Sequence, residues 1–397
     1  CDDKRSSYRN IHLATKMKIN YARIYPLSIP LVEPIKMSGE TITFANTIVL
    51  ELRDSAGNTG WGEASVAPLM TGETLDSLLA SIKYLVSKCK EFDWDKPDVY
   101  INCLDKVLYG NSSAKSCLEM ALMDLHTQEA RIPLWKFLRN RLGVNAGEKP
   151  QPLSLLRMLG GTLDKEIADA KKFHDAGYRH WKIKVGLLPL SADLDRVQFL
   201  CKLLDTDTVS VDANGAFSLE DAIRFCTSEK TKGLAFAEQL ISPDLPITDF
   251  FALRSKSNLP IGLDESIHGK NELERFIAAG ATDGASLKLI KTGGLLGALT
   301  CASLLESNGL KINLACKVAE TSIGAAAAAA VGFALDKLDW GFSMSNQYLQ
   351  FDVCESPLLG EHGCLHHHQF EKYGIGVSPD PYRLQKLLAK SYSPIAC

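Results

Sequence analysis

Three acidic residues recur along the chain at a constant interval, each at the end of a short apolar run. Asp212 ends TVSVD, Glu238 ends LAFAE and Asp264 ends IGLD, so both steps are 26 residues long. Carboxylates that converge repel one another, and a divalent cation between them removes the repulsion. An all-oxygen set without histidine or cysteine suits Mg²⁺ or Mn²⁺ and argues against Zn²⁺. We therefore predict that these three residues are metal ligands.

Two lysines precede the carboxylates and a third follows them. In HWKIKVG, residues 180–186, strand alternation places Lys182 and Lys184 on one face and Trp181 on the other. Lysines on an exposed strand edge are the plain alternative. Inside a barrel they would face the carboxylates, with Lys288 of SLKLIK on the far side.

A lysine acts as a base only when its pKa falls from the ordinary value of about 10.4. A second ammonium about 4 Å away contributes roughly 4 kcal/mol at an effective dielectric of about 20, or about 3 pKa units. We therefore expect Lys182 to lower the pKa of Lys184. Lys184 and Lys288 are then predicted as catalytic bases on opposite faces of a substrate.

The lysines and carboxylates can meet in this way only if their strands form a parallel barrel. After residue 150, short apolar runs alternate with amphipathic stretches and, apart from the first interval, recur about every 26 residues. That rhythm is typical of an α/β protein with a (β/α)8-type barrel, whose active site lies at the carboxyl ends of the strands. The eight runs are LSLLRML, HWKIKVG, TVSVDANG, LAFAEQL, PIGLDES, GASLKL, KINLAC and DWGFS.

An α+β domain precedes the barrel. Residues 18–65 alternate as strands around a turn at SAGNTG, and residues 73–142 have a helical period. We divide the chain into a disordered or artificial leader (1–16), an α+β capping domain (17–145), a barrel catalytic domain (150–352) and a C-terminal segment (353–397) that packs back on the capping domain.

Composition excludes several classes of protein. A formal charge of −3 and a pI near 6.3 argue against nucleic acid or an anionic membrane as partner, and favour a small molecule. The sequence has no run of the roughly 18 apolar residues that a membrane-spanning helix needs. The 11 cysteines are scattered without a CxxC pair, which favours reduced thiols and a cytoplasmic location.

Together these motifs resemble the enolase superfamily, and within it the muconate lactonizing enzyme subgroup of the mandelate racemase/muconate lactonizing enzyme family. The resemblance rests on KxK at 182–184, on the three carboxylates and on LKLIKTGG, and it extends from INYARIYPL to GIGVSPD. It implies a magnesium-dependent enzyme that removes the proton α to a carboxylate through a metal-stabilised enediolate. It also implies that Lys184 acts on an S-configured centre and Lys288 on an R-configured one.

The resemblance suggests further residues around the metal and the substrate. Glu320, in AETS, is either a hydrogen-bonding partner of the substrate or a helix cap. Asn214 and Glu265 are expected beside the metal ligands. The run HHH at 366–368 is interpreted as incidental, because adjacent residues cannot all face one ion.

Two loops of the capping domain, PIKMSGE and PLMTGET, are expected to close over the barrel and recognise the substrate. Lys36 and Met37 in the first loop, and Met70 and Thr71 in the second, are the candidate specificity residues.

The leading hypothesis is an isomerase: a racemase, epimerase or cycloisomerase of a small carboxylate or amino-acid derivative. A lyase or dehydratase resembling o-succinylbenzoate synthase is the second, and a non-catalytic binding protein is the third. Dipeptide epimerases of the subgroup carry DxD after the last strands, whereas this chain reads DWGFSMSNQYL, which counts against a dipeptide substrate. The resemblance further implies a homo-oligomer.

Overall fold

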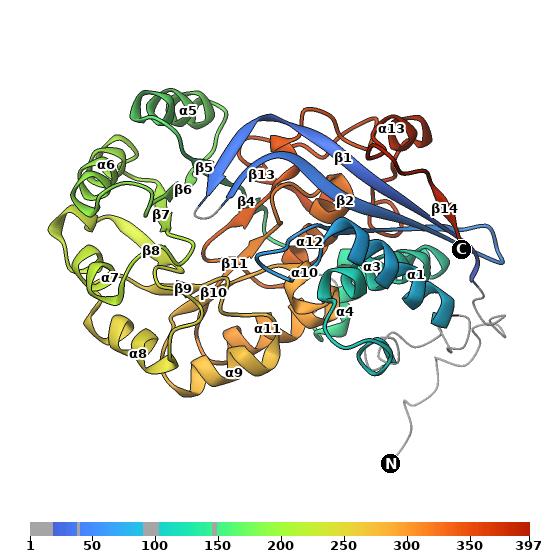
Figure 1. Cartoon of the computed structure of the whole chain (residues 1–397), viewed down its shortest axis with the longest axis horizontal. Coiled ribbons are helices and arrows are strands. Elements are labelled where there is room, and N and C mark those ends of the chain that lie inside the picture. The colour runs from blue at the N-terminus through green and yellow to red at the C-terminus, as the bar shows by residue number, and fades with distance from the viewer. Residues whose placement is uncertain (1–18, 38–39, 90–102, 145–148) are drawn as a thin grey trace, which may run out of the picture.

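The computed structural model describes residues 19–37, 40–89, 103–144 and 149–397; the predicted leader, 1–16, lies outside them. Figure 1 shows a barrel with helices around it and, beside it, a domain of long strands and helices. The long β1–β2 hairpin of that domain extends across to the barrel (Figure 1). No helix in the described part of the chain has the length and apolarity needed to span a bilayer.

An antiparallel sheet forms the centre of the first domain. Its first three strands are β1 (Ile19–Met37), β2 (Glu40–Asp54) and β3 (Thr59–Ser65). A turn with Gly57 at a φ of +89° joins β2 to β3, a backbone conformation that glycine adopts without strain. The last strand of the chain, β14 (Ile395–Ala396), pairs with β1 on its other edge, so the sheet order is β14-β1-β2-β3.

Helices cover the sheet of the first domain. They are α1 (Leu75–Cys89) and α3 (Ser112–Glu129), while α4 (Leu134–Arg141) packs against α3 and against the barrel. Helix α3 lies directly on β3 because Gly60 and Gly62 share one face of that strand. A Cβ atom on Gly60 would come within 2.2 Å of Ala121 O, and one on Gly62 within 1.9 Å of Cys117 O. The two glycines therefore permit the close approach of the helix.

Eight parallel strands pair in chain order to form the barrel, which confirms the predicted fold. A parallel bridge between Leu155 and Phe342 joins the ends of the sheet, so the barrel is nearly closed. The strands are β5 (Leu156–Leu159), β6 (His180–Lys184), β7 (Thr208–Asp212), β8 (Leu234–Glu238), β9 (Ile261–Leu263), β10 (Gly284–Leu287), β11 (Lys311–Ala315) and β12 (Phe342–Ser343).

Helices connect consecutive strands on the outside of the barrel. They are α5 (Leu163–Asp175), α6 (Leu190–Leu203), α7 (Leu219–Cys226), α8 (Ile247–Lys256), α9 (Lys270–Ala278), α11 (Leu295–Ser307) and α12 (Ser322–Ala334), with the short α10 (Leu289–Thr292) before α11 and the 3₁₀ turn η1 (Glu229–Thr231) before β8. Between β12 and Cys364 the chain forms only the 3₁₀ turn η2 (Asn346–Tyr348), so the eighth unit lacks its helix.

Helix α12 is built almost entirely from small residues, all of them buried. A Cβ atom on its Gly332 would lie 2.8 Å from a methyl carbon of Leu153. The alanine-rich run therefore forms a helix that packs closely against its neighbours, as the sequence predicts.

The chain returns to the first domain after the barrel. The short strand β13 (Cys364–Leu365) pairs with β4 (Leu153–Ser154), and the 3₁₀ turn η3 (His367–Phe370) and helix α13 (Pro381–Lys386) follow. Within the C-terminal segment, the run YGIGVSP forms only one bridge, between Gly374 and Pro133. Most of its backbone is therefore outside any ladder.

Candidate active site

Strand β6 directs two lysines into the barrel. Lys182 and Lys184 line a cavity of about 550 Å³, whereas Trp181 and Ile183 are fully buried on the opposite face of the strand. Lys182 Nζ donates to a carboxylate oxygen of Glu238 at 2.6 Å. Lys184 Nζ donates to Asp212 Oδ2 at the same distance of 2.6 Å. The two ammonium groups therefore pair with carboxylates on different strands.

The parallel register brings the three carboxylates together. Lys184 is the register partner of Asp212, and Asp212 is the register partner of Glu238. Glu238 faces Gly262 of β9, and Asp264 follows Gly262 by two positions. All three acidic residues line the cavity, and their exposed fractions are only 2%, 1% and 2%.

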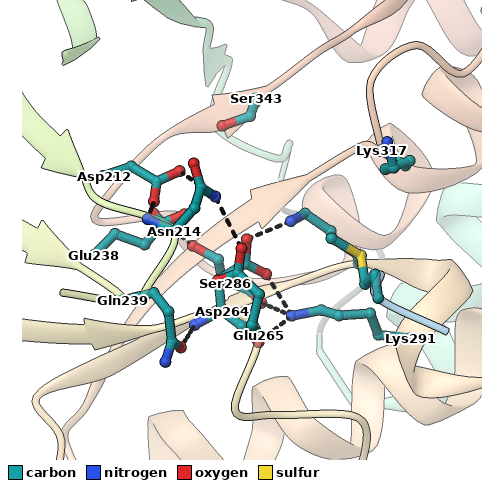
Figure 2. Close-up of polar contacts among 12 residues, drawn as sticks. Asp212, Asn214, Glu238, Gln239, Asp264, Glu265, Ser286, Lys291, Lys317 and Ser343 are labelled. Atoms are coloured by element: carbon teal, nitrogen blue, oxygen red, sulfur yellow. Dashed lines mark hydrogen bonds and ion pairs between the residues drawn. The ribbon is translucent and has the colours of Figure 1, made fainter. Parts of the chain in front are cut away.

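Two further lysines hold Asp264 from the other side. Lys288 follows β10 and donates to one carboxylate oxygen. Lys291 in α10 donates to the other carboxylate oxygen and to the carbonyl oxygen of Asp264 (Figure 2). Lys291 was not predicted from the sequence, although it stands three residues after Lys288 in LKLIKTGG. Because β10 lies four strands from β6 in a ring of eight, Lys288 faces Lys184 across the barrel.

Asn214 and Glu265, predicted beside the metal ligands, line the cavity themselves. Asn214 Oδ1 accepts a hydrogen bond from Lys184 Nζ at 2.8 Å, and Asn214 Nδ2 donates to Glu265 Oε1 at 2.8 Å (Figure 2). Within the part of the chain that the structure describes, Glu265 Oε2 is buried and has no hydrogen-bond partner. An orphaned carboxylate oxygen is costly, so a cation or a substrate donor would satisfy it.

Burial and the neighbouring charges shift the pKa values of the carboxyl groups in opposite directions. Burial raises the pKa of Asp212, but the charges of Lys184 and Lys182 outweigh burial and bring the pKa below its ordinary value. The same competition holds the pKa of Asp264 well below its ordinary value, through Lys288 and Lys291. Burial and the charge of Asp264 raise the pKa of Glu265 to about 7.

The predicted lowering of the pKa of Lys184 is wrong for this arrangement of charges. Burial lowers the pKa of its ammonium, but the adjacent Asp212 carboxylate outweighs burial and the pKa is raised. The charge of Lys182 does not dominate because its ammonium pairs with Glu238. The pKa of Lys288 is also raised, since the effect of Asp264 exceeds that of burial.

The chemical type of the donor atoms, which are all carboxylate oxygens, suits a hard divalent cation. Asp212, Glu238 and Asp264 offer carboxylate oxygens from neighbouring strands, and Glu265 adds the orphaned oxygen. Among the described residues, no three acidic, histidine or cysteine side chains are arranged to hold an ion as they stand. Lysine ammonium groups lie on the carboxylate oxygens instead.

The second predicted loop of the first domain reaches the cavity. Met70 lines it together with Ala67 and Leu69, and His268 Nε2 of the barrel lies 2.7 Å from Met70 O. Thr71 instead turns back within the loop, where its hydroxyl donates to Ala67 O at 3.4 Å. Of the two candidates in this loop, Met70 is thus placed to touch a substrate.

The first predicted loop is only partly described. Lys36 is exposed near the end of β1, and the side chain of Met37 and residues 38–39 lie outside the described part of the chain. Glu33, in the same strand, forms an ion pair with Lys165 of α5 at 3.0 Å. The hairpin therefore contacts the barrel beside these positions.

Glu320 is neither a helix cap nor a residue of the cavity wall. Its Oε2 accepts a hydrogen bond from Lys317 N at 3.2 Å, inside the turn after β11. Burial, with the nearby Glu63, raises the pKa of Glu320 to about 8. The cap of α12 is Thr321, supported by Glu63 from β3, which the sequence analysis did not identify.

The three consecutive histidines lie in and beside η3, and their contacts are structural. The ring of His367 packs edge-on against Trp135, with centroids 5.7 Å apart, and His368 Nε2 lies 3.6 Å from Glu361 Oε2. His366 is outside the cavity and precedes the turn as its N-terminal cap.

Comparison with known proteins shows which family this chain resembles. The family model "Enolase C-terminal domain-like" matches residues 165–383, and the model "Mandelate racemase / muconate lactonizing enzyme, N-terminal domain" matches residues 21–138. D-Ala-D/L-Ala epimerase from Cytophaga hutchinsonii is 30% identical over 321 residues, which cover 79% of this chain and 83% of that enzyme.

Two solved structures share the whole architecture. Muconate lactonizing enzyme from Pseudomonas fluorescens, complexed with muconolactone, has a TM-score of 0.87 at 27% identity, covering 94% of this chain and 100% of the other. A dipeptide epimerase from Cytophaga hutchinsonii, complexed with Mg and D-Ala-L-Val, has a TM-score of 0.85 at 26% identity, covering 96% of this chain and 100% of the other.

A barrel with acidic and lysine side chains at its strand ends and an α+β domain alongside is the arrangement of enolase-type enzymes. This chain belongs to the mandelate racemase/muconate lactonizing enzyme family of the enolase superfamily, and the resemblance noted from the sequence is confirmed. Its relatives are epimerases and cycloisomerases, and the chain is an isomerase of that family.

Proposed function

We propose that this isomerase transfers a proton at the carbon α to the carboxylate of a small carboxylic acid or amino-acid derivative, in a racemisation or epimerisation. One observation carries the proposal. Lys184 and Lys288 extend from strands on opposite sides of the barrel, and the three carboxylates end the strands between them. Inverting a carbon centre by proton transfer needs one base on each face of the substrate, which this arrangement provides.

Each side chain then has a defined task. Asp212 and Asp264 raise the pKa values of Lys184 and Lys288, and a cation on these carboxylates would offset that effect. Lys184 would then take the α-proton from one face of the substrate and Lys288 would return a proton to the other face, or the reverse for the opposite enantiomer. Asp212, Glu238 and Asp264 would hold Mg²⁺ or Mn²⁺, which when bound supplies positive charge that stabilises the enediolate form of the substrate. Lys182, beside Glu238, adds positive charge to the same region.

The substrate is proposed to be an N-acylated amino acid or a similar carboxylate, and not a free dipeptide. Several relatives are named dipeptide epimerases, and dipeptide epimerases of the subgroup carry DxD after the last strands. In this chain Ser343 ends β12 and Ser345 follows it, so no acidic pair is present there to bind an ammonium group.

Cycloisomerisation is the second candidate, favoured by the similarity to muconate lactonizing enzyme over the whole chain. It moves a proton on one face of the substrate only, so it would need one of the two lysines. A lyase would also need only one of the two lysines. Dependence of the reaction on one lysine alone would therefore distinguish a cycloisomerase or a lyase from a racemase.

Proton exchange into D₂O, followed by NMR, tests the proposal with each lysine replaced in turn. With Mg²⁺ present, the wild-type enzyme should exchange the α-proton of both enantiomers of an N-acylated amino acid. Lys184→Ala should exchange only the R enantiomer and Lys288→Ala only the S enantiomer, and neither variant should interconvert them. Lys256→Ala, an exposed lysine on α8, is the matched control.

Other results would overturn the proposal. If only one of the two variants loses exchange, and loses it with both enantiomers, while the wild type closes a lactone or eliminates water, cycloisomerisation or elimination replaces racemisation. Homo-oligomeric assembly, the cytoplasmic location and the domain boundaries remain predictions from the sequence.

A further inference from the structure

Three charged side chains form a buried cluster beside the end of β6, and none of them lines the cavity. This Arg196 cluster consists of Glu166 in α5 and of Asp193 and Arg196 in α6, whose side chains are 0%, 0% and 10% exposed. Arg196 Nη1 donates to Glu166 Oε1 at 2.6 Å, and Arg196 Nη2 donates to Asp193 Oδ1 at 2.8 Å. The guanidinium group therefore joins the helix before β6 to the helix after it.

The Arg196 cluster also holds the backbone around Lys184. Arg196 Nη2 donates to Lys184 O, and Asp193 Oδ2 accepts a hydrogen bond from Gly186 N at 2.7 Å. An ion pair that served only to join α5 and α6 would need neither of these two contacts. Both contacts fall on the peptide groups that follow the lysine.

Lys184 needs this support because β5 ends before it. The last register pair between the two strands joins Leu159 of β5 to Ile183 of β6, so Lys184 lies one residue beyond it. At that point α6 supplies the donor to the carbonyl oxygen of Lys184. The side chain of lysine is long and flexible, so the position of its Nζ depends on where its backbone is held.

The backbone of the second proposed base is held differently. Lys288 O accepts hydrogen bonds from Lys291 N at 3.0 Å and from Thr292 N at 3.1 Å, both within the turn of α10. The Arg196 cluster belongs to the helices on either side of β6, and β10 lies four strands away. A change in the cluster should therefore displace Lys184 and leave Lys288 in place.

We propose that the Arg196 cluster positions Lys184 for proton transfer, and that Arg196 is a positioning residue for this base and not for Lys288. The inference rests on the proposed function, because it takes Lys184 to be one of two bases. Arg196 does not touch the substrate and acts through the backbone at the end of β6.

Proton exchange in D₂O measures the two bases separately, because each enantiomer loses its proton to a different lysine. Arg196→Met should slow exchange of the enantiomer that Lys184→Ala fails to exchange, expected to be S. The expected loss is about tenfold to a hundredfold, since a small misplacement of a reacting group has an effect of that order. Exchange of the other enantiomer should change little. Arg196→Lys, which keeps the charge, should restore part of the lost rate.

Arg254→Met is the matched control. Arg254 in α8 also joins a carboxylate to a backbone carbonyl group, because its Nε donates to Asp283 Oδ1 and its Nη1 donates to Gly280 O, both at 2.9 Å. Both partners precede β10, so they lie near the amino ends of the strands, away from the lysines. This variant should not slow one enantiomer more than the other.

A second measurement needs no turnover. In metal-free protein labelled with ¹⁵N at lysine Nζ, Arg196→Met should shift the ammonium signal of Lys184, assigned with Lys184→Arg, and leave that of Lys288 in place. If Arg196→Met does not fold, as judged by thermal unfolding, it is combined with Glu166→Gln, which removes one of the two carboxylates left unpaired.

Equal slowing of both enantiomers in the folded variant, slowing of neither, or an unchanged Lys184 signal would overturn the inference. Failure of the proposed function is a separate result. If the wild type exchanges neither enantiomer, the proposed function is contradicted, and the NMR signal of Lys184 alone decides whether the Arg196 cluster positions this lysine.

Discussion

At the scale of single residues, the candidate site is a set of matched charges. Lys182 pairs with Glu238, Lys184 with Asp212, and both Lys288 and Lys291 with Asp264. Breaking a buried pair by removing one partner typically costs about 3 to 5 kcal/mol, because the remaining charge is left uncompensated. Four buried lysines are therefore stable here only because the carboxylates accompany them.

Replacing Glu238 by Gln tests the proposed metal ligands. Chelator-treated wild-type protein should bind Mg²⁺ or Mn²⁺ in calorimetry, and Glu238→Gln should weaken that binding at least about tenfold, or about 1.4 kcal/mol, because a neutral amide replaces a charged ligand. Asp244→Asn, at an exposed position on the cavity rim, is the control and should change the affinity little. An identical affinity in Glu238→Gln would remove this residue from the ligand set.

At the scale of elements, glutamates of the first domain cap helices of the barrel. Glu63 of β3 accepts hydrogen bonds from Thr321 N and Gly324 N at the start of α12. Glu119 of α3 accepts from Leu296 N at 2.9 Å, at the start of α11. An anion at a helix N-terminus is favourable because it satisfies free N–H groups and meets the positive end of the helix dipole. These caps lie beside α10, which carries Lys291, and beside the turn after β11, which carries Lys317.

Gly294→Ala should destabilise the protein by about 3 kcal/mol in urea unfolding. Its φ is +136°, and an added Cβ would come within 1.8 Å of Glu119 Oε2, so the substitution combines backbone strain with displacement of a buried carboxylate. Gly293→Ala is the matched control, since Gly293 has a φ of +79° with nothing near the new atom. The control should cost about 1 kcal/mol. Equal losses in the two variants would contradict a structural role for the Glu119 cap.

At the scale of the whole molecule, Asp124 connects three distant parts of the chain. Its carboxylate, on α3, accepts hydrogen bonds from Trp61 N of β3 and from Ile375 N of the C-terminal segment, both at 2.9 Å. Gly374 leaves room for it, because a Cβ there would lie 2.0 Å from Asp124 Oδ1. Burial raises the pKa of Asp124 from 3.8 to about 7, against the effect of these hydrogen bonds.

This pKa shift predicts a pH dependence of stability. Between pH 4 and 7 the unfolded chain loses the Asp124 proton while the folded chain keeps it, so stability falls as pH rises and then stays constant above about pH 7. The stability advantage of the wild type over Asp124→Asn should therefore shrink by roughly 2 to 3 kcal/mol between about pH 5 and about pH 7.5. Urea unfolding at both pH values measures it, with Glu355→Gln as the control for loss of an exposed negative charge. A difference that does not change with pH would refute the shift.

Much of the barrel could be predicted because its signals are local. Strand alternation in HWKIKVG decides that Lys182 and Lys184 share a face, and the 26-residue repeat decides that Asp212, Glu238 and Asp264 end consecutive strands. Parallel pairing of these strands in register then brings their carboxyl ends together, and no long-range contact has to be known to predict it. The eighth unit departs from the repeat because MSNQYL, which follows DWGFS, has no helical apolar period.

The sequence by itself thus determined the barrel, the family and which side chains meet at its mouth, since each depends on short-range periodicity. The tertiary structure decided which carboxylate each lysine pairs with, and hence that the pKa of Lys184 is raised. It also decided that Glu63 caps a helix whose contacting residues are 258 and 261 positions away, and that Lys317 enters the cavity wall. Such contacts depend on how separate elements dock, and side-chain spacing along one element carries no information about its distant partner.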